Sequence, residues 1–377
     1  MSKAAELAKM GEVITNSQLS GRRNIVINGG MNVAQRSVSV AALGDGDEGY
    51  VTLDRIRHTA AASAGRFTSA QTAISDLPGF LNCLHLDCTT ADTSIAATEL
   101  LVLEHRIEGQ DLQQLKKGTS DAEKVTVSFY MKTNAAFVFM CVLNDFDNNR
   151  VNTQKFTTTT GWTRHSITFA GDTTGVLNDD NALSLSVSIY LHAGSNFTGG
   201  TYVSNAWQSR SSSDNMIAPG IGSFYSNTSN DVKLTGLQLE VGSVATPFEN
   251  RSFGEELALC QRYFTKEAAA SGAAYKSYAM GQAATTTVAR CSVFLPTSMR
   301  STPTLVLSGN VNTFAGNSAG GSDACTAIAL SGDGDAGTDN VSVSLNVTVG
   351  SGYVAGDAVE LLSNNNTSTH FAFDAEL

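Results

Sequence analysis

The residues best suited to chemistry in this sequence lie in a polar stretch that runs from Ser195 to Asn230. It combines aromatic and hydrogen-bonding side chains: Tyr202, Trp207, Gln208, Arg210 and Tyr225. Exposed aromatic faces stack on the apolar face of a pyranose, while amide and guanidinium groups bind its hydroxyls. Because Ser, Asn and Gly are abundant here, we expect long loops. These five residues are therefore candidates for binding a sugar or another receptor.

A second polar cluster places closely spaced oxygen atoms in one loop. It reads Asp145-Phe146-Asp147-Asn148-Asn149. Carboxylate and amide oxygens are the ligands that Ca²⁺ prefers. The segment is no EF-hand, since Arg150 stands where that motif needs Gly and Phe156 where it needs Glu. Calcium is therefore the one cofactor that the sequence leaves open.

No set of residues has the full pattern of a catalytic centre. The segment 44–49 matches G-x-G-x-x-G but has no helical pattern after it, and its acids would repel a pyrophosphate. The segment 316–320 matches a nucleophile elbow without the flanking strand and helix. Glu104 and Glu108 would resemble an acid/base pair on a helix, although a solvated face is the better explanation. We therefore expect no enzymatic activity.

Composition excludes several classes of partner. The 377 residues carry a net charge of −11, which argues against nucleic acid and anionic membrane surfaces. No apolar run is long enough for membrane insertion, and the first residues lack the apolar block of a signal peptide. We expect synthesis in a cytoplasm. The six cysteines are then best explained as free thiols packed like small apolar residues.

Apolar periodicity predicts many short strands. Leu183 to Ile189 alternates strictly, and Phe137 to Leu143 is almost continuously apolar. Ile25 to Ile27 is expected to open the first domain as a strand. From Asp231 to Val241 the alternation slips by one residue near a glycine, as at a bulge. Phe253 to Phe264 follows with helical spacing.

The predicted fold class is all-β. We expect a jelly-roll β-sandwich over residues 23–265, which ends in the short helix, and a smaller C-terminal β-sandwich domain over 266–377. Residues 1–22 are predicted to be a short N-terminal helical arm, because Leu7, Met10 and Ile14 share one helical face. The Ala-rich residues 267–272 are the expected linker.

Three segments resemble a known family. LTGLQLEVGSVATPFENRSFGEELALCQRYF (234–264), RRNIVINGGMNVAQR (22–36) and GYVTLDRIR (49–57) resemble segments of tail-fibre and other appendage proteins of bacteriophages, of marine phages especially. FLPTSMRSTPTLVLSG and HFAFDAEL resemble the small β domain that often follows. Family members usually carry Trp where this chain has Ile56, so no aromatic function is inferred there.

The resemblance implies a jelly roll similar to a carbohydrate-binding module and a structural virion protein. Such a tail fibre attaches to other tail proteins, here through residues 1–22, and recognises a host-surface glycan or protein without catalysis. It implies a homotrimer in the phage tail or appendage, assembled in the host cytoplasm. Asp231, at the start of the last strand, stands where such jelly rolls often hold a structural calcium; a turn cap is the alternative.

Two alternatives of other classes remain at this point. One is a polysaccharide depolymerase tailspike, which would need paired carboxylates. The other is a purely structural neck or decoration protein. Since loops vary without disturbing a β core, we expect receptor specificity in the C-terminal tip domain.

Overall fold

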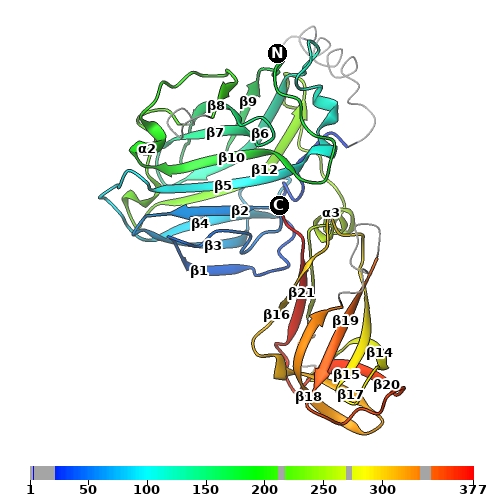
Figure 1. Cartoon of the computed structure of the whole chain (residues 1–377). Helices are drawn as coiled ribbons and strands as arrows, with labels where there is room; N and C mark the ends of the chain where they lie inside the picture. Colours follow the sequence, from blue (N-terminus) through cyan, green and yellow to red (C-terminus); the bar gives the residue numbers. More distant parts are fainter. Residues whose placement is uncertain (1–2, 4–21, 211–216, 269–273, 332–340) are drawn as a thin grey trace. The chain divides into compact units, whose positions relative to one another are not determined.

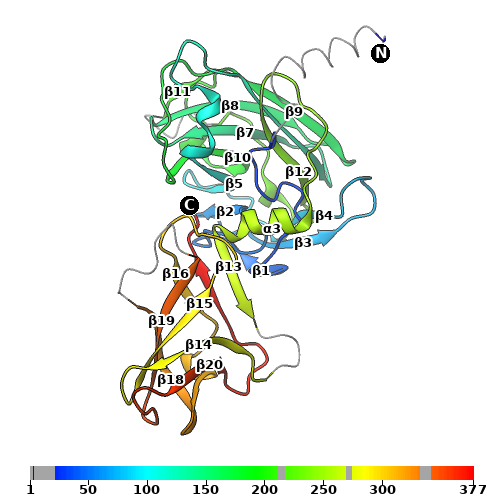
Figure 2. The ribbon, with the colours of Figure 1, turned by 90° about the vertical axis from the view of Figure 1, so that its right-hand side faces the viewer.

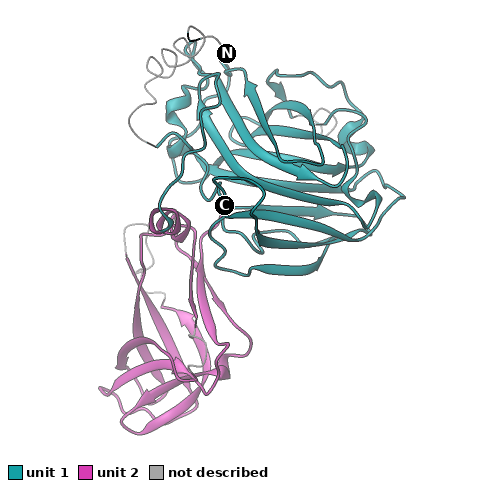
Figure 3. Ribbon diagram, turned by 180° about the vertical axis from the view of Figure 1, so that it is seen from behind, with its two compact units in different colours: residues 1–253, 377 teal, residues 254–376 magenta. Residues whose placement is uncertain are grey.

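The fold is described from a computed structural model that covers residues 3, 22–210, 217–268, 274–331 and 341–377. The predicted N-terminal arm and its attachment role therefore lie, apart from Lys3 and Arg22, outside the described residues. The chain divides into two compact units, residues 1–253 with 377 and residues 254–376 (Figure 3). Among the described residues, no helix is long and apolar enough to cross a membrane.

The first unit is a jelly-roll β-sandwich of two six-stranded antiparallel sheets (Figure 1). The sheet that we name the β12 sheet has the order β1 (Ser39–Leu43), β3 (Arg66–Ala73), β4 (Asn82–Thr90), β12 (Asp231–Val241), β6 (Val125–Thr133) and β9 (Thr163–Phe169). The β10 sheet has the order β11 (Gln208–Ser209), β8 (Arg150–Thr157), β7 (Val138–Asp145), β10 (Leu183–Ala193), β5 (Leu100–Glu108) and β2 (Arg57–Ala61). The all-β prediction is confirmed.

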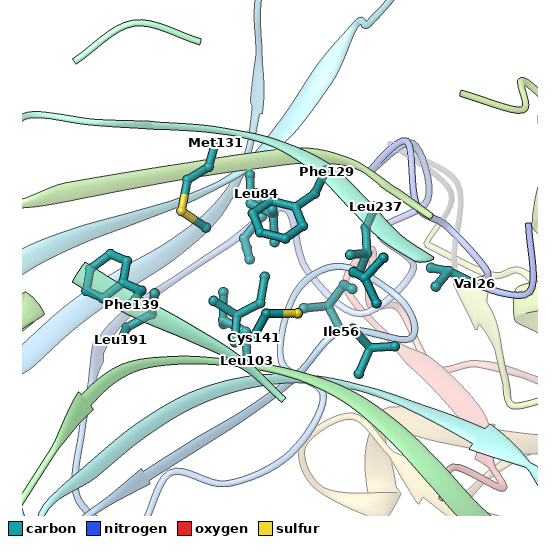
Figure 4. Packing of buried hydrophobic residues seen from close by; sticks show 14 of the residues in the cluster. Val26, Ile56, Leu84, Leu103, Phe129, Met131, Phe139, Cys141, Leu191 and Leu237 are labelled. Carbon is teal, nitrogen blue, oxygen red and sulfur yellow. The ribbon is translucent and has the colours of Figure 1, made fainter. Parts of the chain in front are cut away.

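Alternate residues of the two sheets meet in one hydrophobic core. Figure 4 shows Phe129 and Met131 of β6 on one side and Phe139 and Cys141 of β7 on the other. Successive side chains of a strand point to opposite faces, so alternate residues of the central strands reach this layer. Short helical turns connect the strands: η1 (Gly109–Asp111), η2 (Gln113–Leu115), α2 (Ser195–Thr198) and η4 (Phe224–Ser226).

The opening strand predicted at Ile25 to Ile27 is wrong, although all three residues are buried. Their amides are bound individually: that of Val26 donates to Asn24 Oδ1 at 3.0 Å, and that of Ile27 to His105 Nε2 at 3.0 Å. Side chains therefore bind two of the three amides, and only the Ile25 amide donates to a strand, at the Leu239 carbonyl. The apolar run reflects burial of an irregular segment and not a sheet position.

The bulge predicted in the last strand is confirmed. The register between β12 and β6 shifts between Thr235 and Gln238, and Gly236 has a φ of 65°. This left-handed conformation suits glycine, which has no Cβ. The bulge turns the second half of β12 so that Leu237 and Leu239 both reach the core.

The second unit is also a β domain, but its strands do not form the predicted sandwich. Six strands close into a barrel with the order β14 (Ser277–Ala283), β15 (Val288–Phe294), β19 (Ser342–Val349), β18 (Gly321–Leu330), β17 (Phe314–Ser318) and β20 (Ala358–Ser363) (Figure 2). A three-stranded sheet, β13 (Phe264–Ala268), β21 (His370–Asp374) and β16 (Thr304–Leu307), accompanies it, with the turn η5 at Val311–Thr313. Closure removes the open edges that a small sandwich would expose.

The division between the units lies earlier than the boundary predicted after residue 265. The helix α3 (Phe253–Gln261), which the sequence placed at the end of the jelly roll, and β13 belong almost entirely to the second unit. The reason is that β13 pairs with β21 along its whole length. Residues 269–273, most of the predicted linker, lie outside the described residues.

The interpretation of the cysteines as small buried apolar residues is confirmed. All six are free and buried. Burial raises the pKa of the Cys83 thiol to about 12 and that of Cys291 to about 11. The unreactive thiol form therefore prevails at neutral pH.

We predict that Gly236→Ala destabilises the first unit by about 1–3 kcal/mol. A methyl group there would lie 2.8 Å from Phe80 Cζ and 3.0 Å from Tyr130 Cδ2, on a backbone that disfavours any Cβ. Urea unfolding followed by tryptophan fluorescence measures the change. Both tryptophans, Trp162 and Trp207, belong to the first unit, so the signal reports this unit alone.

Gly161→Ala is the matched control, because a Cβ at Gly161 meets no atom within 4 Å and φ there is not in the left-handed region. Its unfolding free energy should stay within about 0.5 kcal/mol of wild type or rise slightly. Equal losses in the two variants would contradict the assigned function of the bulge.

Candidate functional site

The polar stretch after β10 covers part of the outer face of the β10 sheet, the face turned away from the core. Side chains of the sheet and of the stretch form a second, smaller hydrophobic cluster there: Val102, Met140, Val142, Val151, Tyr190, Ala193, Ile217 and Ala218, with Leu100, Phe197, Tyr202 and Ile221 against it. The prediction of long loops is thus confirmed. The loops are packed, however, and this changes the position of several candidate residues.

Tyr225 is a core residue, contrary to the prediction that it binds a ligand. Its side chain is fully buried between Phe67, Phe224 and His192. It lies in the turn η4, which brings the chain back into the sandwich before β12. No face of the ring is left for a sugar.

We name residues 199–210 of the polar stretch the covering loop. Trp207, Tyr202 and Gln208 hold this loop on the β10 sheet. Trp207 is half-buried, and its indole N–H donates to the Ala170 carbonyl at 2.7 Å. The Tyr202 hydroxyl accepts from the Lys155 amide at 3.3 Å. Gln208 pairs with Val151 in the ladder between β11 and β8. The chain thus uses these residues for local structure, and the sequence did not distinguish this use from ligand binding.

Arg210 lies elsewhere, on a cleft. The cleft holds about 490 Å³ and opens on the outer face of the β10 sheet, next to the covered part, with which it shares Val102, Tyr190 and Phe197. Its lining comes from the strands β2, β5, β7 and β10 and from adjoining loops: Glu48, Arg57, Thr59, Leu100, Val102, Glu104, Arg106, Asn144, Phe146, Asn149, Tyr190, Phe197 and Arg210.

Charged side chains in the cleft are arranged as a chain of ion pairs. Arg57 contacts Glu48 at 2.7 Å and Glu104 at 3.1 Å. Arg106 contacts the same Glu104 oxygen at 3.2 Å. These pairs fix the three side chains that stand across β2 and β5, where Arg57 is the register partner of Glu104. Pre-oriented donors and acceptors lose little conformational entropy when a ligand binds.

An aromatic ring stands at the other side of the cleft between two guanidinium groups. The Arg106 Cζ atom lies 5.9 Å from the centroid of the Phe146 ring, and the Arg210 Cζ atom lies 5.5 Å from it. Both are within the range of cation–π attraction. Tyr190 is almost fully buried at the cleft, where burial, with Glu104 adding its charge, raises the pKa of its phenol. The phenol therefore stays protonated and can donate.

The sequence did not identify most of this cleft. One signal was present in LLVLEHRIE: Leu101 and Leu103 point to the core, so the alternate positions Glu104 and Arg106 must share the opposite face. The same pattern shows that Glu104 and Glu108 lie on a strand and not on a helix. Four strand residues span roughly 13 Å, which is too far for an acid/base pair.

The geometry does not favour calcium at Asp231. The residue does begin β12, as predicted. Its carboxylate faces the nitrogen atoms of two side chains, however: Lys233 Nζ lies 3.3 Å away and His85 Nε2 3.6 Å away. Hydrogen bonding by His85, opposed by burial and assisted by Lys233, lowers the pKa of Asp231. No group of three or more His, Cys, Asp or Glu residues able to hold a metal occurs in the described part of the chain.

In the loop predicted to bind calcium, a lysine ammonium stands among the oxygens. Lys117 Nζ donates to Asp145, to Asp172 at 2.9 Å and to the Gly175 carbonyl at 3.0 Å. Its side chain is only 4% exposed. The loop is thus suited to a cation, as predicted, but the chain supplies that cation itself.

Arg150 and Trp207 complete this Lys117 network. Arg150 binds Asp172 through two nitrogens, at 2.6 and 3.0 Å, and Lys117 Nζ lies 4.6 Å from the centroid of the Trp207 ring. Burial raises the pKa of Asp172, but hydrogen bonds from Arg150, Lys117 and Thr174 outweigh it and bring the pKa to about 2. The network therefore joins the Asp145 loop, β8 and the covering loop at one point.

Ser223, His192 and Glu99 are connected in the order of a serine–histidine–acid catalytic triad. The Ser223 hydroxyl lies 2.9 Å from His192 Nδ1, and His192 Nε2 lies 2.8 Å from a Glu99 oxygen. The imidazole has no exposed surface. Since a catalytic histidine must deliver a proton to the leaving group, this one is out of reach. It is best explained as a buried polar network that fastens the turn before η4.

No model of a protein family matches this chain, and no curated protein matches it. Solved structures with a similar arrangement include a family 11 carbohydrate-binding module from Clostridium thermocellum in complex with a β-1,3-1,4-mixed-linked tetrasaccharide. That structure is 10% identical, with a TM-score of 0.27 over 56% of this chain and 99% of the other.

Two further solved structures have an arrangement similar to that of this chain. TmCBM61 in complex with β-1,4-galactotriose is 11% identical, with a TM-score of 0.29 over 58% of this chain and 99% of the other. The enzymatically active domain of tailspike protein 4 of bacteriophage CBA120 is 8% identical, with a TM-score of 0.28. There the match covers 58% of this chain and 21% of the tailspike chain. Function is therefore argued from the residues of the cleft.

We predict that Lys117→Met destabilises the first unit by roughly 3–5 kcal/mol, because it leaves Asp145 and Asp172 buried with less compensating charge. Lys116→Met is the matched control: its ammonium pairs with Glu123 at 2.8 Å but is 54% exposed, so its unfolding curve should stay close to that of wild type. Urea unfolding measured by circular dichroism, which is insensitive to the altered Trp207 environment, gives both values.

Calcium removal is part of the same test. Because the Lys117 ammonium stands among the loop oxygens, addition of EDTA should leave the unfolding midpoint of the wild-type protein unchanged. A midpoint that falls with EDTA and recovers with calcium would show that a metal site exists after all.

Proposed function

We propose that this protein is a non-catalytic virion appendage protein of a bacteriophage and that it binds a host-surface glycan in the β10-sheet cleft. The observation that carries the proposal is the cleft itself. It combines aromatic rings, Phe146 and Phe197, with oriented guanidinium and carboxylate groups on a rigid sheet. Sugar-binding sites need both an apolar surface for the ring and fixed partners for the hydroxyls.

The cleft chemistry favours binding over cleavage. Hydrolysis of a glycosidic bond needs one carboxyl group that donates a proton and a second that acts as base or nucleophile. Glu48 and Glu104 both contact Arg57, and Glu104 also contacts Arg106. Both carboxylates are thus already engaged as acceptors of guanidinium N–H groups. The depolymerase alternative is tested by assaying reducing ends released from any polysaccharide that binds.

The appendage part of the proposal rests on the sequence. The segments 22–36 and 234–264 resemble phage appendage proteins, and they lie close together in the fold. The Ile25 amide donates to the Leu239 carbonyl at 3.0 Å, and the Asn24 side chain bonds to the Leu237 carbonyl at 3.2 Å. Within the first unit, the segment 22–36 is thus bonded to the part of 234–264 that belongs to β12, where the chain enters the sandwich. We propose that residues 1–22 attach this unit to the particle.

We predict that Phe146→Ala weakens binding to a glycan array and to intact host cells at least tenfold, which corresponds to about 1.4 kcal/mol. The change removes the ring and the surface that orients Arg106 and Arg210. Phe294→Ala, in the second unit and 79% exposed, is the matched control and should bind like wild type. Unfolding curves of both variants verify that each is folded.

The opposite result has a definite meaning. If Phe294→Ala loses binding and Phe146→Ala keeps it, the receptor is recognised by the C-terminal domain, as the sequence alone suggested, and the cleft is not the site. If neither variant nor the wild-type protein binds cells, the structural neck or decoration alternative is favoured.

We predict further that the protein is present in purified phage particles and is a homotrimer. Mass spectrometry of particles banded on a density gradient tests the first point, with host cytoplasmic proteins as the control for contamination. Mass photometry of the purified protein at submicromolar concentration tests the second, since subunits of a symmetric appendage should associate without the particle. Absence from particles would refute the virion assignment, and a monomer would refute the trimer.

A further inference from the structure

We propose, resting on the binding function above, that the cleft selects an acidic saccharide and that Arg210 holds the carboxylate or sulfate group of that sugar. Arg210 was a candidate from the sequence as a reader of hydroxyls. Its surroundings in the cleft give it a more specific function. Three observations carry this step: the pairing of the other arginines, the surroundings of the Arg210 guanidinium, and the way its backbone is held.

The other two arginines of the cleft are already matched by carboxylates. Arg57 lies between Glu48 and Glu104, and Arg106 contacts Glu104. A ligand anion at either guanidinium would have to compete with a protein carboxylate already in place. Arg106 is further engaged through Nη1, which donates to the main-chain oxygen of Leu377 at 2.9 Å. These two residues are therefore poorly suited to hold the anionic group of a ligand.

The Arg210 guanidinium has a different environment. Within the described part of the chain, no carboxylate lies within 4 Å of it and no oxygen accepts a hydrogen bond from it; it lies over the Phe146 ring, 5.5 Å from the ring centroid, and its charge acts on Tyr190. A guanidinium carries five N–H donors in a planar fork that matches two oxygens of one oxyanion. The cleft thus presents a positive charge whose hydrogen-bonding capacity is open to a ligand.

The backbone of Arg210 is held in place at the cleft. Its amide donates to the Asn149 carbonyl at 2.8 Å, and the Asn149 side chain donates to the Arg210 carbonyl at 3.4 Å. Asn149 itself lines the cleft. Arg210 is therefore fixed at its backbone by these two hydrogen bonds and at its guanidinium by the Phe146 ring. An anchored, uncompensated arginine pays little ordering entropy when it binds an oxyanion in bidentate geometry.

The negative charge of the whole chain does not contradict this selection. At physiological ionic strength charges more than about 8 Å apart are largely screened, so the nearest groups decide which ligand is accepted. Arg106, like Arg210, lies within cation–π range of the Phe146 ring, 5.9 Å from its centroid. The overall charge of −11 instead limits nonspecific attraction of polyanions.

The test measures binding of the full-length protein to matched polymers by biolayer interferometry in 0.15 M salt. The probes are polygalacturonate, its methyl ester, a sulfated galactan, the desulfated galactan and neutral mixed-linkage β-glucan. We expect one acidic polymer to bind at least tenfold more tightly than its uncharged counterpart. The polymer that shows the preference distinguishes a carboxylate from a sulfate.

Variants connect the preference to one residue. Arg210→Gln should remove the preference for the acidic form and leave affinity for the uncharged form within about twofold; Arg210→Lys should recover only part, because an ammonium cannot hold two oxygens in the planar geometry. Lys155→Gln, an exposed lysine on β8, makes the same change in net charge and should have no effect.

The outcomes separate this inference from the proposed function. Equal affinity for charged and uncharged polymers, or an acidic preference that survives Arg210→Gln, overturns the inference while glycan binding stands. If Phe146→Ala leaves binding to every polymer unchanged, the cleft is not the binding site and both proposals fall. Loss of the preference in Lys155→Gln as well would show that net charge, and not Arg210, sets it.

Discussion

The β10 sheet is buried over its whole inner face and over part of its outer face, and this constraint shapes the rest of the first unit. One face of β10 and β7 supplies the core; the other carries Asn144, Ser186 and Ser188, whose side chains are almost completely buried. Their polar groups bond to one another, with Asn144 Nδ2 3.0 Å from the Ser188 hydroxyl and the two serine hydroxyls 2.9 Å apart. Buried polar groups without partners are costly. This part of the outer face therefore has the character of a protein interior, and a second layer of chain must cover it.

The Lys117 network explains how an irregular loop can provide that cover. A loop lacks the ladder of a sheet, so its position must be fixed by side chains. Asp145 and Asp172 attract Lys117 and Arg150 to one point, and Arg150 reaches the Trp207 carbonyl at 3.4 Å. Buried ion pairs add little net stability, but breaking one is costly. The network therefore specifies a single position for the loop more than it stabilises the fold.

The sequence predicted strands and the bulge better than the environment of individual side chains. Alternation in Leu183 to Ile189 identified β10 and its core-facing residues, but alternation cannot show whether the opposite face is covered. Tyr225 was misplaced for this reason: a polar neighbourhood suggested exposure, whereas the turn η4 returns the ring to the core. The pairing at Asp231 was more accessible, because Lys233 two positions later on a strand must share its face.

Other features depend on contacts between distant segments that no local pattern contains. Arg57 meets Glu104 only because β2 pairs with β5, and Arg210 meets Phe146 only because the covering loop returns along β8. The strands β14, β17 and β18 are rich in Gly, Ala and Ser, so their apolar periodicity is weak, and the barrel they help to close was predicted as a sandwich.

The cleft lies where the cover of the β10 sheet ends. There the outer face changes from apolar residues such as Val102 to the charged residues Glu104 and Arg106 of the same strand. Burying these charged groups under a second layer would require a partner for each of them. In an open cleft, water molecules can bind the charged groups in the absence of a ligand. β5 thus packs against the covering loop near one end and lines the polar cleft near the other. This arrangement leaves the cleft rigid, because its floor belongs to a sheet whose opposite face is packed in the core.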